Sequence, residues 1–190
     1  VVIWDFDGTL AHRPERWSGA ILAAVRAAGI GCTAGPADIS PLLQQGFPWH
    51  RPEVIRPAGR DPDVWWADLT PVLVRAIRAV TEADAGTAER VARLVPGIYA
   101  DPTSWAVYAD TIAVLDSLQR AGWTQVVLSN HVPELSSILA GLGLSRFFDR
   151  TFNSAQTGVE KPHPAAFRQV LETMPTRGPV WMVGDSLEAD

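Results

Sequence analysis

The sequence predicts an α/β fold, in which a doubly wound parallel sheet with helices on both faces is interrupted by an inserted, all-helical segment. Three observations predict this fold. Short apolar runs at 1–4, 123–128 and 180–183 alternate with helical patterns, which is typical of βαβ units. Each run is followed at once by polar residues, as expected at the carboxyl edge of a parallel sheet. Between residues 13 and 100 the sequence shows helical patterns and no strand signal.

Composition limits the classes of function. Apolar residues make up 47% of the 190 residues, which is enough for a packed core. The net charge of −5 gives no support to nucleic-acid binding, and no segment approaches the length of a membrane span. The single cysteine, Cys32, excludes an internal disulfide, so we expect a reducing, cytoplasmic location. Nothing in the composition indicates the oligomeric state.

The first apolar run leads directly into two carboxylates. Residues 1–4 are continuously apolar, as in a strand buried on both faces, and Asp5 and Asp7 follow with the spacing that places both on one side. Gly8 then allows a sharp turn. Because two adjacent carboxylates repel each other, a hard, oxygen-seeking cation such as Mg²⁺ is the simplest partner for them.

The helical segment follows the first strand. Helical spacing predicts helices at about 17–28, 36–45, 63–80 and 87–95, with a long loop at 46–62 and a helix stop at Pro96 and Gly97. We therefore expect residues 13–103 to form a cap, and residues 1–12 and 104–190 to form the α/β core. Hinges near 11–16 and 97–110 would let the cap close over the crevice and exclude water.

The second half of the chain returns to the α/β pattern. The expected order is a helix at 103–120, a strand at 123–128, a helix at 133–142, a short strand at 150–153, a helix at 164–173 capped by His163, and a strand at 180–183.

Residues with chemical potential stand at the predicted strand ends. Ser129 and Asn130 follow the second strand, Asp185 follows the last, and Lys161 lies beside the third. Together with Asp5 and Asp7 they would meet in one crevice at the sheet edge. An acidic pair, a hydroxyl, an ammonium and a further carboxylate suit phosphoryl transfer, in which a carboxylate attacks phosphorus while a cation and an ammonium neutralise its oxygens.

This pattern resembles the haloacid dehalogenase superfamily of phosphohydrolases, in the subgroup with a helical cap inserted after the first strand of a Rossmann-like core. Four stretches carry the resemblance, in the family's order and from one end of the chain to the other. They are residues 5–10 (DFDGTL), Ser129 with Asn130, Lys161 with Pro162, and residues 184–186 (GDS) followed by Asp190.

The resemblance implies a role for each matching residue. Asp5 would be the nucleophile that becomes aspartyl-phosphate, and Asp7 the general acid and base. Ser129 and Asn130 would bind the phosphoryl group, and Lys161 would stabilise its charge and that of Asp5. The family's metal is Mg²⁺, which Asp5, the backbone carbonyl of Asp7, and Asp185 would hold, with Asp190 in support.

The resemblance also limits the reaction. Members that dehalogenate or cleave phosphonates usually lack the second aspartate, so Asp7 favours phosphate monoesters. We therefore expect a Mg²⁺-dependent phosphatase of a small phosphorylated metabolite. The alternatives are a phosphomutase of a sugar phosphate and a catalytically silent binding or regulatory module. Because the family's fold normally continues past the last motif, we also expect that the C-terminal part of the core is missing from this chain.

Several other side chains favour structural roles. His12 and His131 each follow a core motif and could border the crevice, although packing is the expected role of both. Trp65 and Trp66 are expected to pack the cap. Three arginines are expected in a solvated loop, with contact to an anionic leaving group as the alternative: Arg51, Arg56 and Arg60.

Overall fold

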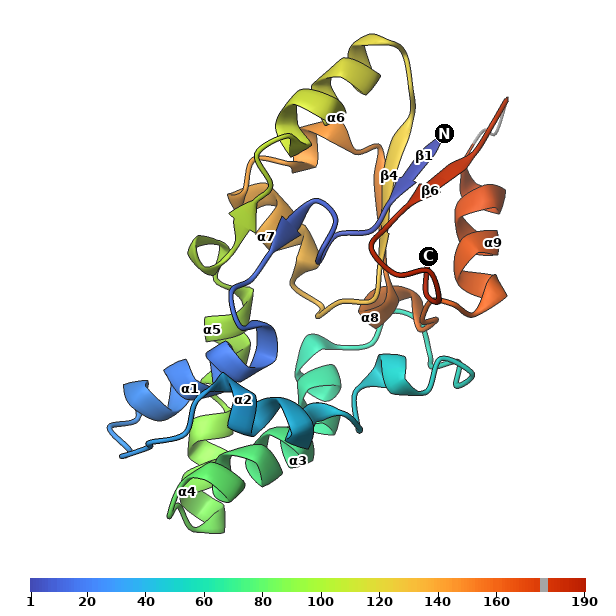
Figure 1. Ribbon diagram of the computed structural model, residues 1–190. Coiled ribbons are helices and arrows are strands. Elements are labelled where there is room, and N and C mark those ends of the chain that lie inside the picture. The colour runs from blue at the N-terminus through green and yellow to red at the C-terminus, as the bar shows by residue number, and fades with distance from the viewer. Residues whose placement is uncertain (175–177) are drawn as a thin grey trace.

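The computed structural model describes residues 1–174 and 178–190 and confirms the α/β class. Its main sheet has the order β5-β4-β1-β6, and every pair of neighbouring strands is parallel. Because all four strands run in the same direction, their carboxyl ends meet at one edge of the sheet (Figure 1). The strands are β1 (Val2–Trp4), β4 (Gln125–Ser129), β5 (Arg150–Asn153) and β6 (Trp181–Val183).

Helices cover both faces of this sheet (Figure 1). Successive side chains of a strand point to opposite faces, so Trp4 and Ile3 of β1 belong to two different buried clusters. Trp4 packs with residues of α6 (Thr111–Arg120) and α7 (Leu135–Gly141). Ile3 packs with residues of α9 (Pro164–Thr173), which His163 caps by accepting a hydrogen bond from the backbone N–H of Ala165 at 3.1 Å. The short helix α8 (Ser154–Thr157) follows β5.

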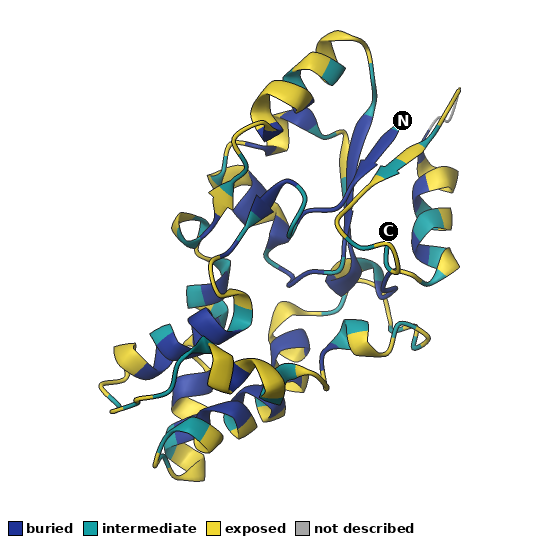
Figure 2. Cartoon of the chain, viewed as in Figure 1, coloured by how far each residue is buried: buried dark blue, intermediate teal, exposed yellow. Residues whose placement is uncertain are grey.

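A block of helices lies between β1 and α6. Its elements are α1 (Arg16–Ala27), α2 (Pro36–Ile39), η1 (Ser40–Leu43), η2 (Pro48–His50), α3 (Pro62–Val80), α4 (Ala85–Ala92), α5 (Val95–Ala100) and η3 (Pro102–Ser104). Two of these helices begin where a side chain accepts from a free backbone N–H: Asp61 does so for α3 and Asp84 for α4. Figure 2 shows that buried residues lie on the facing sides of these helices. Trp65 and Trp66 are both buried in this block.

The prediction of one helix over 103–120 is wrong at its N-terminal end. In the structure η3 is followed by a two-residue strand, β3 (Ala106–Val107), and the helix begins only at Thr111. Strand β3 pairs antiparallel with β2 (Ala11–His12). This pairing with a distant segment takes residues 106 and 107 out of the predicted helix. The β2–β3 pair marks the two points at which the chain passes between the core and the helical block (Figure 1).

The predicted helix stop at Pro96 and Gly97 is also wrong. Both residues lie inside α5, and Pro96 stands in its first turn. The first N–H groups of a helix have no partner within the helix, so proline is tolerated there. The proline therefore helps to begin α5, and the preceding helix α4 already ends at Ala92.

Strand β6 lies at an edge of the sheet, and its Trp181 is 59% exposed although the run is apolar as predicted.

The loop at 46–62 reaches the core, because the backbone N–H of Arg56 donates to the carbonyl of Gly158 at 2.8 Å and the backbone N–H of Gly59 donates to the carbonyl of Gln156 at 2.7 Å. Across residues 1–174 and 178–190, every helix falls short of the length and apolarity that crossing a membrane requires.

Candidate active site

The end of strand β1 positions the central carboxylate. Asp5 is 7% exposed, and its backbone N–H donates to the carbonyl of Val183 at 2.9 Å, which joins it to β6. Gly8 has a φ of 97°, and a Cβ at this position would lie 2.2 Å from Oδ2 of Asp185. Only glycine combines this backbone conformation with such a close approach. The turn after β1 therefore brings Asp185 of the last motif next to the first.

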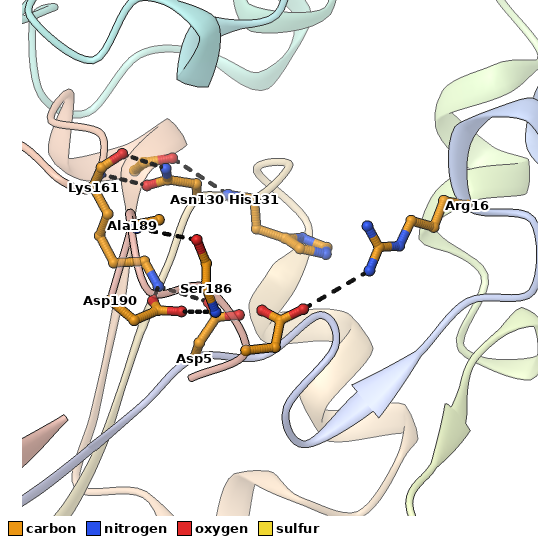
Figure 3. A network of polar contacts seen from close by, with 10 residues as sticks. Asp5, Arg16, Asn130, His131, Lys161, Ser186, Ala189 and Asp190 are labelled. Carbon is orange, nitrogen blue, oxygen red and sulfur yellow. Dashed lines mark hydrogen bonds and ion pairs between the residues drawn. The ribbon is translucent and has the colours of Figure 1, made fainter. Parts of the chain in front are cut away.

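A buried lysine lies between two carboxylates (Figure 3). Lys161 Nζ is 2.8 Å from Oδ1 of Asp5 and also forms an ion pair with Asp190. Burial raises the pKa of Asp5, while the Lys161 ammonium and a hydrogen bond from Ser129 oppose that rise. Lys161 and Ser129 are thus placed to stabilise the ionised form of Asp5, which is the form that attacks as a nucleophile.

Three carboxylates form a group that fits a metal ion. Asp5, Asp185 and Asp190 each offer an oxygen atom, and these oxygens lie within 4.8 Å of one another. A Cβ at Gly184 would lie 2.1 Å from Oδ2 of Asp190, so the glycine leaves room for that carboxylate. Oxygen donors of this kind are those that Mg²⁺ prefers. The structure thus brings Asp190, expected in a supporting position, into the same group as Asp5 and Asp185.

Asp7 has the electrostatic environment of a proton carrier. Burial, and secondarily the charges of Asp5 and Asp185, raise its pKa to about 6, although the Arg16 guanidinium opposes the rise. Within the described chain its Oδ1 has no hydrogen-bond partner. A carboxyl group with a pKa near neutrality can both donate and accept a proton at physiological pH. Asp5 is 2.8 Å from the Lys161 ammonium, whereas the Arg16 guanidinium is 4.0 Å from Asp7, so the two carboxyl groups differ in environment.

Asn130 contacts the backbone of Lys161. Its Nδ2 donates to the Lys161 carbonyl at 2.8 Å, and its Oδ1 accepts from the Lys161 N–H at 2.7 Å. These bonds join the loop after β4 to the loop that carries the lysine (Figure 3). The side chain of Asn130 is thereby engaged in holding Lys161.

All seven predicted site residues line one cavity of about 520 Å³: Asp5, Asp7, Ser129, Asn130, Lys161, Asp185 and Asp190. Its opposite wall belongs to the helical block and consists of Arg16, Trp17, Trp49, Pro52 and Tyr99. Sequence reasoning did not single out any of these wall residues, because which residues of the block face Asp5 depends on how its helices pack. The three arginines at 51, 56 and 60 are absent from this lining.

The two histidines after the core motifs occupy different places. His131 lines the cavity and packs against the rings of Phe6 and Trp105, each 5.3 Å away between centroids. Burial lowers its pKa to about 3, although the Val132 backbone acts in the opposite direction, so the ring is neutral at physiological pH. His12 lies on β2 beside Tyr108, outside the cavity lining.

The arrangement can carry out group transfer to a carboxylate. One cavity holds a buried carboxylate paired with an ammonium, a second carboxyl group that can exchange a proton, and further oxygen donors for a cation. These are the components that transfer of a phosphoryl group by nucleophilic catalysis requires.

The comparisons with known proteins agree with this chemistry. A family model described as "Hydrolase: haloacid dehalogenase-like hydrolase" matches residues 1–190. The chain is 28% identical over 175 residues to haloacid dehalogenase-like hydrolase domain-containing protein 3 of Danio rerio, covering 90% of this chain and 70% of that protein. It is 31% identical to a phosphoserine phosphatase of Thermus thermophilus, over 56% of this chain and 42% of the relative. It is 26% identical to a phosphoglycolate phosphatase of Pectobacterium atrosepticum, over 96% and 70%.

The fold is shared with solved structures. One is a HAD-hydrolase, YfnB, from Bacillus subtilis bound to magnesium, with a TM-score of 0.75 and 18% identity, covering all of this chain (100%) and 79% of that one. The matched regions span between 42% and 70% of the curated relatives' own lengths.

Proposed function

The chain belongs to the haloacid dehalogenase-like hydrolases, and from that premise we propose that it is a Mg²⁺-dependent phosphatase of small phosphorylated metabolites that acts through an aspartyl-phosphate. The names of two relatives, a phosphoserine and a phosphoglycolate phosphatase, support a small phosphate ester as substrate. We also propose a cytoplasmic location, because the lone Cys32 cannot form a disulfide within the chain.

The ion pair between Lys161 and Asp5 is the observation that carries the proposal. The Asp5 carboxylate attacks the phosphorus atom of the ester, so that an O–P bond forms to Asp5 while the bond to the leaving oxygen breaks. The Lys161 ammonium, 2.8 Å from Asp5, and the Ser129 hydroxyl stabilise the negative charge of the phosphoryl oxygens. Asn130 keeps Lys161 in place through its backbone.

Asp7 moves the protons in both half-reactions. Protonated Asp7 donates to the leaving oxygen in the first step and becomes a carboxylate. It then takes a proton from the water molecule that attacks the aspartyl-phosphate, which releases inorganic phosphate and restores Asp5. The pKa of about 6 supports this double role, since both protonation states of Asp7 are accessible near neutrality.

Asp5, Asp185 and the Asp7 backbone carbonyl would hold the magnesium ion, and Asp190 would support them. The oxygen donors of Asp5, Asp185 and Asp190 within 4.8 Å of one another support this assignment. When bound, Mg²⁺ supplies positive charge that polarises the phosphoryl group and favours the ionised form of Asp5. Lys161 is then free to interact with phosphoryl oxygens as well as with Asp5.

We propose that residues 13–103 form a cap that excludes water from the site. Supporting this, residues of the helical block form one wall of the cavity that contains Asp5. The β2–β3 pair, which lies within the predicted hinges at 11–16 and 97–110, would be the connection about which the cap moves.

Substitution of the nucleophile tests the proposal. Asp5→Asn keeps the size of the side chain but replaces the carboxylate with a poor nucleophile, so phosphate release should vanish while circular dichroism shows an unchanged fold. The assay uses a panel of phosphorylated metabolites with Mg²⁺. Near-parental phosphate release by folded Asp5→Asn would overturn the assignment. Transfer of the phosphoryl group to a sugar would favour a phosphomutase, and Mg²⁺ binding without any turnover would favour a silent module.

A further inference from the structure

We propose that Arg16 binds a second anionic group, a carboxylate or a phosphate, on the leaving group of the substrate, and thereby selects among phosphate monoesters. The inference rests on the proposed function and adds a specificity-determining residue to it. Arg16 lies outside the four motifs at the strand ends, at the start of α1 in the helical block.

Arg16 lies where the leaving group of a bound ester would extend. A phosphoryl group at Asp5 contacts Lys161 on one side, and its leaving oxygen must reach Asp7 to receive a proton. The remainder of the leaving group therefore extends past Asp7. There, Arg16 Nε is 4.0 Å from Asp7 Oδ2, and its Nη2 is 4.0 Å from Asp185 Oδ2. Figure 3 shows Arg16 reaching from the helical block toward the site, on the opposite side of Asp5 from Lys161.

Of the two cationic side chains in the described lining of the cavity, Arg16 is the one without a close ion pair. The described residues that line it include five acidic side chains, Asp5, Asp7, Asp185, Glu188 and Asp190, but only two cations, Lys161 and Arg16. Lys161 is already paired with two carboxylates and is 3% exposed. Arg16 is 61% exposed, and both of its carboxylate neighbours are at the 4.0 Å limit of an ion pair. Its guanidinium therefore has donors available for an incoming anion.

The backbone is strained at Glu15 and Arg16. Glu15 and Arg16 both have left-handed backbone conformations, with φ of 56° and 46°, which residues other than glycine rarely adopt. Arg13, which is buried, braces this turn: its Nη1 donates to the Arg16 carbonyl at 2.8 Å, and its own carbonyl accepts from the Arg16 N–H at 3.1 Å. Strained residues persist where the surrounding structure holds them, and they concentrate at ligand-binding sites.

A second observation on the same cavity points to a ligand. Neither ring nitrogen of His131 has a hydrogen-bond partner in the part of the chain that the structure describes, although the residue is only 3% exposed. Its ring lines the cavity and points toward the Arg16 side of the site (Figure 3). A polar group in the leaving group would supply the partner that the neutral imidazole lacks.

The experiment compares esters that differ only in the second group. Values of kcat/KM are measured with Mg²⁺ for 2-phosphoglycolate, for ethylene glycol bisphosphate, and for 2-hydroxyethyl phosphate as the neutral counterpart. The variants are Arg16→Gln and Arg16→Lys, with Arg78→Gln as a matched control on the exposed side of α3. We expect the parent to prefer an anionic ester, and Arg16→Gln to lower that preference about 10- to 100-fold, the usual effect of losing a hydrogen bond to a charged group. Arg16→Lys should retain part of the preference, and Arg78→Gln should retain all of it.

The outcomes separate this inference from the proposed function. The ester with the larger preference identifies the anion as carboxylate or phosphate. An equal loss on all three esters in Arg16→Gln, or a parent without preference, overturns the role of Arg16 while the phosphatase assignment stands. If none of the three esters is hydrolysed, calorimetric binding of 2-phosphoglycolate and 2-hydroxyethyl phosphate to Asp5→Asn, with and without Arg16→Gln, tests the inference by the ratio of the two affinities. Absence of binding by either ester also overturns the inference. The wider panel of phosphorylated metabolites then tests the proposed function separately.

Discussion

The side chain of Asn130 binds both the N–H and the carbonyl of Lys161, at 2.7 and 2.8 Å. The two residues are 31 positions apart and follow different strands. A side-chain amide can satisfy one backbone donor and one acceptor at once, so it fixes the lysine backbone in position and orientation. Asn130 thus joins the second and third motifs, and the position of the Lys161 ammonium depends on it.

Replacing Asn130 should therefore reduce turnover by displacing Lys161. We expect Asn130→Ala to lower kcat/KM by about 10- to 100-fold, since supporting contacts of functional groups typically contribute that much. Asn130→Asp keeps the acceptor for the Lys161 N–H but loses the donor to its carbonyl, and should remain folded with a loss of turnover. Steady-state kinetics on the two variants, with circular dichroism as the folding control, provide the measurement. Parental kinetics in Asn130→Ala would show that Lys161 needs no such support.

Lys161 should also be important for folding. In Lys161→Met the carboxylates of Asp5 and Asp190 lose their buried counter-ion. Removing one partner of a buried ion pair typically costs about 3–5 kcal/mol, and we expect a loss of this size in the free energy of unfolding at pH 7.5 with a metal chelator present. Mg²⁺ should restore part of it by neutralising the same carboxylates. Urea unfolding measures both values, and a loss below about 1 kcal/mol would contradict the pairing.

The strand ends were predictable from sequence because the signal is local. An apolar run followed by a polar residue predicts both a buried strand and its exposed end, so Asp5, Ser129 and Asp185 are placed correctly at one sheet edge. Asp7 comes two residues after Asp5, and Lys161 follows the predicted strand at 150–153, so both were expected near the same sheet edge. The helix at 164–173 and its His163 cap were also predictable locally, because proline suits the first turn of a helix.

The remaining features depend on tertiary structure. The strands β2 and β3 have two residues each, which is too few to show the alternation of apolar and polar residues that predicts a strand. They form because they pair with each other. The approach of Arg16 to Asp7 depends on a left-handed turn at Glu15 and Arg16, in residues whose type gives no indication of it. Likewise, Asn130 resembles a phosphate ligand in sequence, and only the structure shows its two bonds to Lys161.

The raised pKa of Asp7 predicts a pH-dependent gain in stability for Asp7→Asn. Its pKa is about 6 in the folded protein, against an ordinary value of 3.8, so the folded state holds the proton more tightly. Stability is therefore lost as pH rises from about 4 to 6, by about 3 kcal/mol in total, because each pKa unit corresponds to about 1.4 kcal/mol. Asparagine carries no charge and avoids this loss. Without metal, the variant should exceed the parent by up to about 3 kcal/mol above pH 6 and match it below pH 4.

Urea unfolding of both proteins between pH 3.5 and 8, with a chelator present, checks this difference. Asp68→Asn, a change at an exposed carboxylate of α3, serves as the control and should show no comparable gain above pH 6. A pH-independent difference between Asp7→Asn and the parent would mean that burial does not raise the pKa of Asp7.

The last prediction separates phosphorylation of Asp5 from its hydrolysis. Asp7 is the only motif carboxylate one strand period from the nucleophile, and the pKa of about 3 for His131 leaves that ring a weak base. Asp7→Ala should lose about 10²–10⁴-fold in turnover, the usual contribution of general acid–base catalysis. The loss of rate should be smaller for phosphorylation of Asp5 than for hydrolysis of the aspartyl-phosphate. A nitrophenyl ester, whose leaving group needs no proton, should still phosphorylate Asp5, whereas hydrolysis lacks its base, so phosphorylated protein should accumulate.

Mass spectrometry of Asp7→Ala, quenched in acid during turnover of nitrophenyl phosphate, would detect one added phosphoryl group on Asp5. The double variant with Asp5→Asn is the control and should carry none. Unimpaired steady-state hydrolysis by Asp7→Ala would exclude Asp7 as the base. A large loss of turnover without any phosphorylated protein would instead place the defect in the first step. In that case Asp7 acts before hydrolysis even when the leaving group needs no proton, and its carboxylate must help to position the ester or the metal.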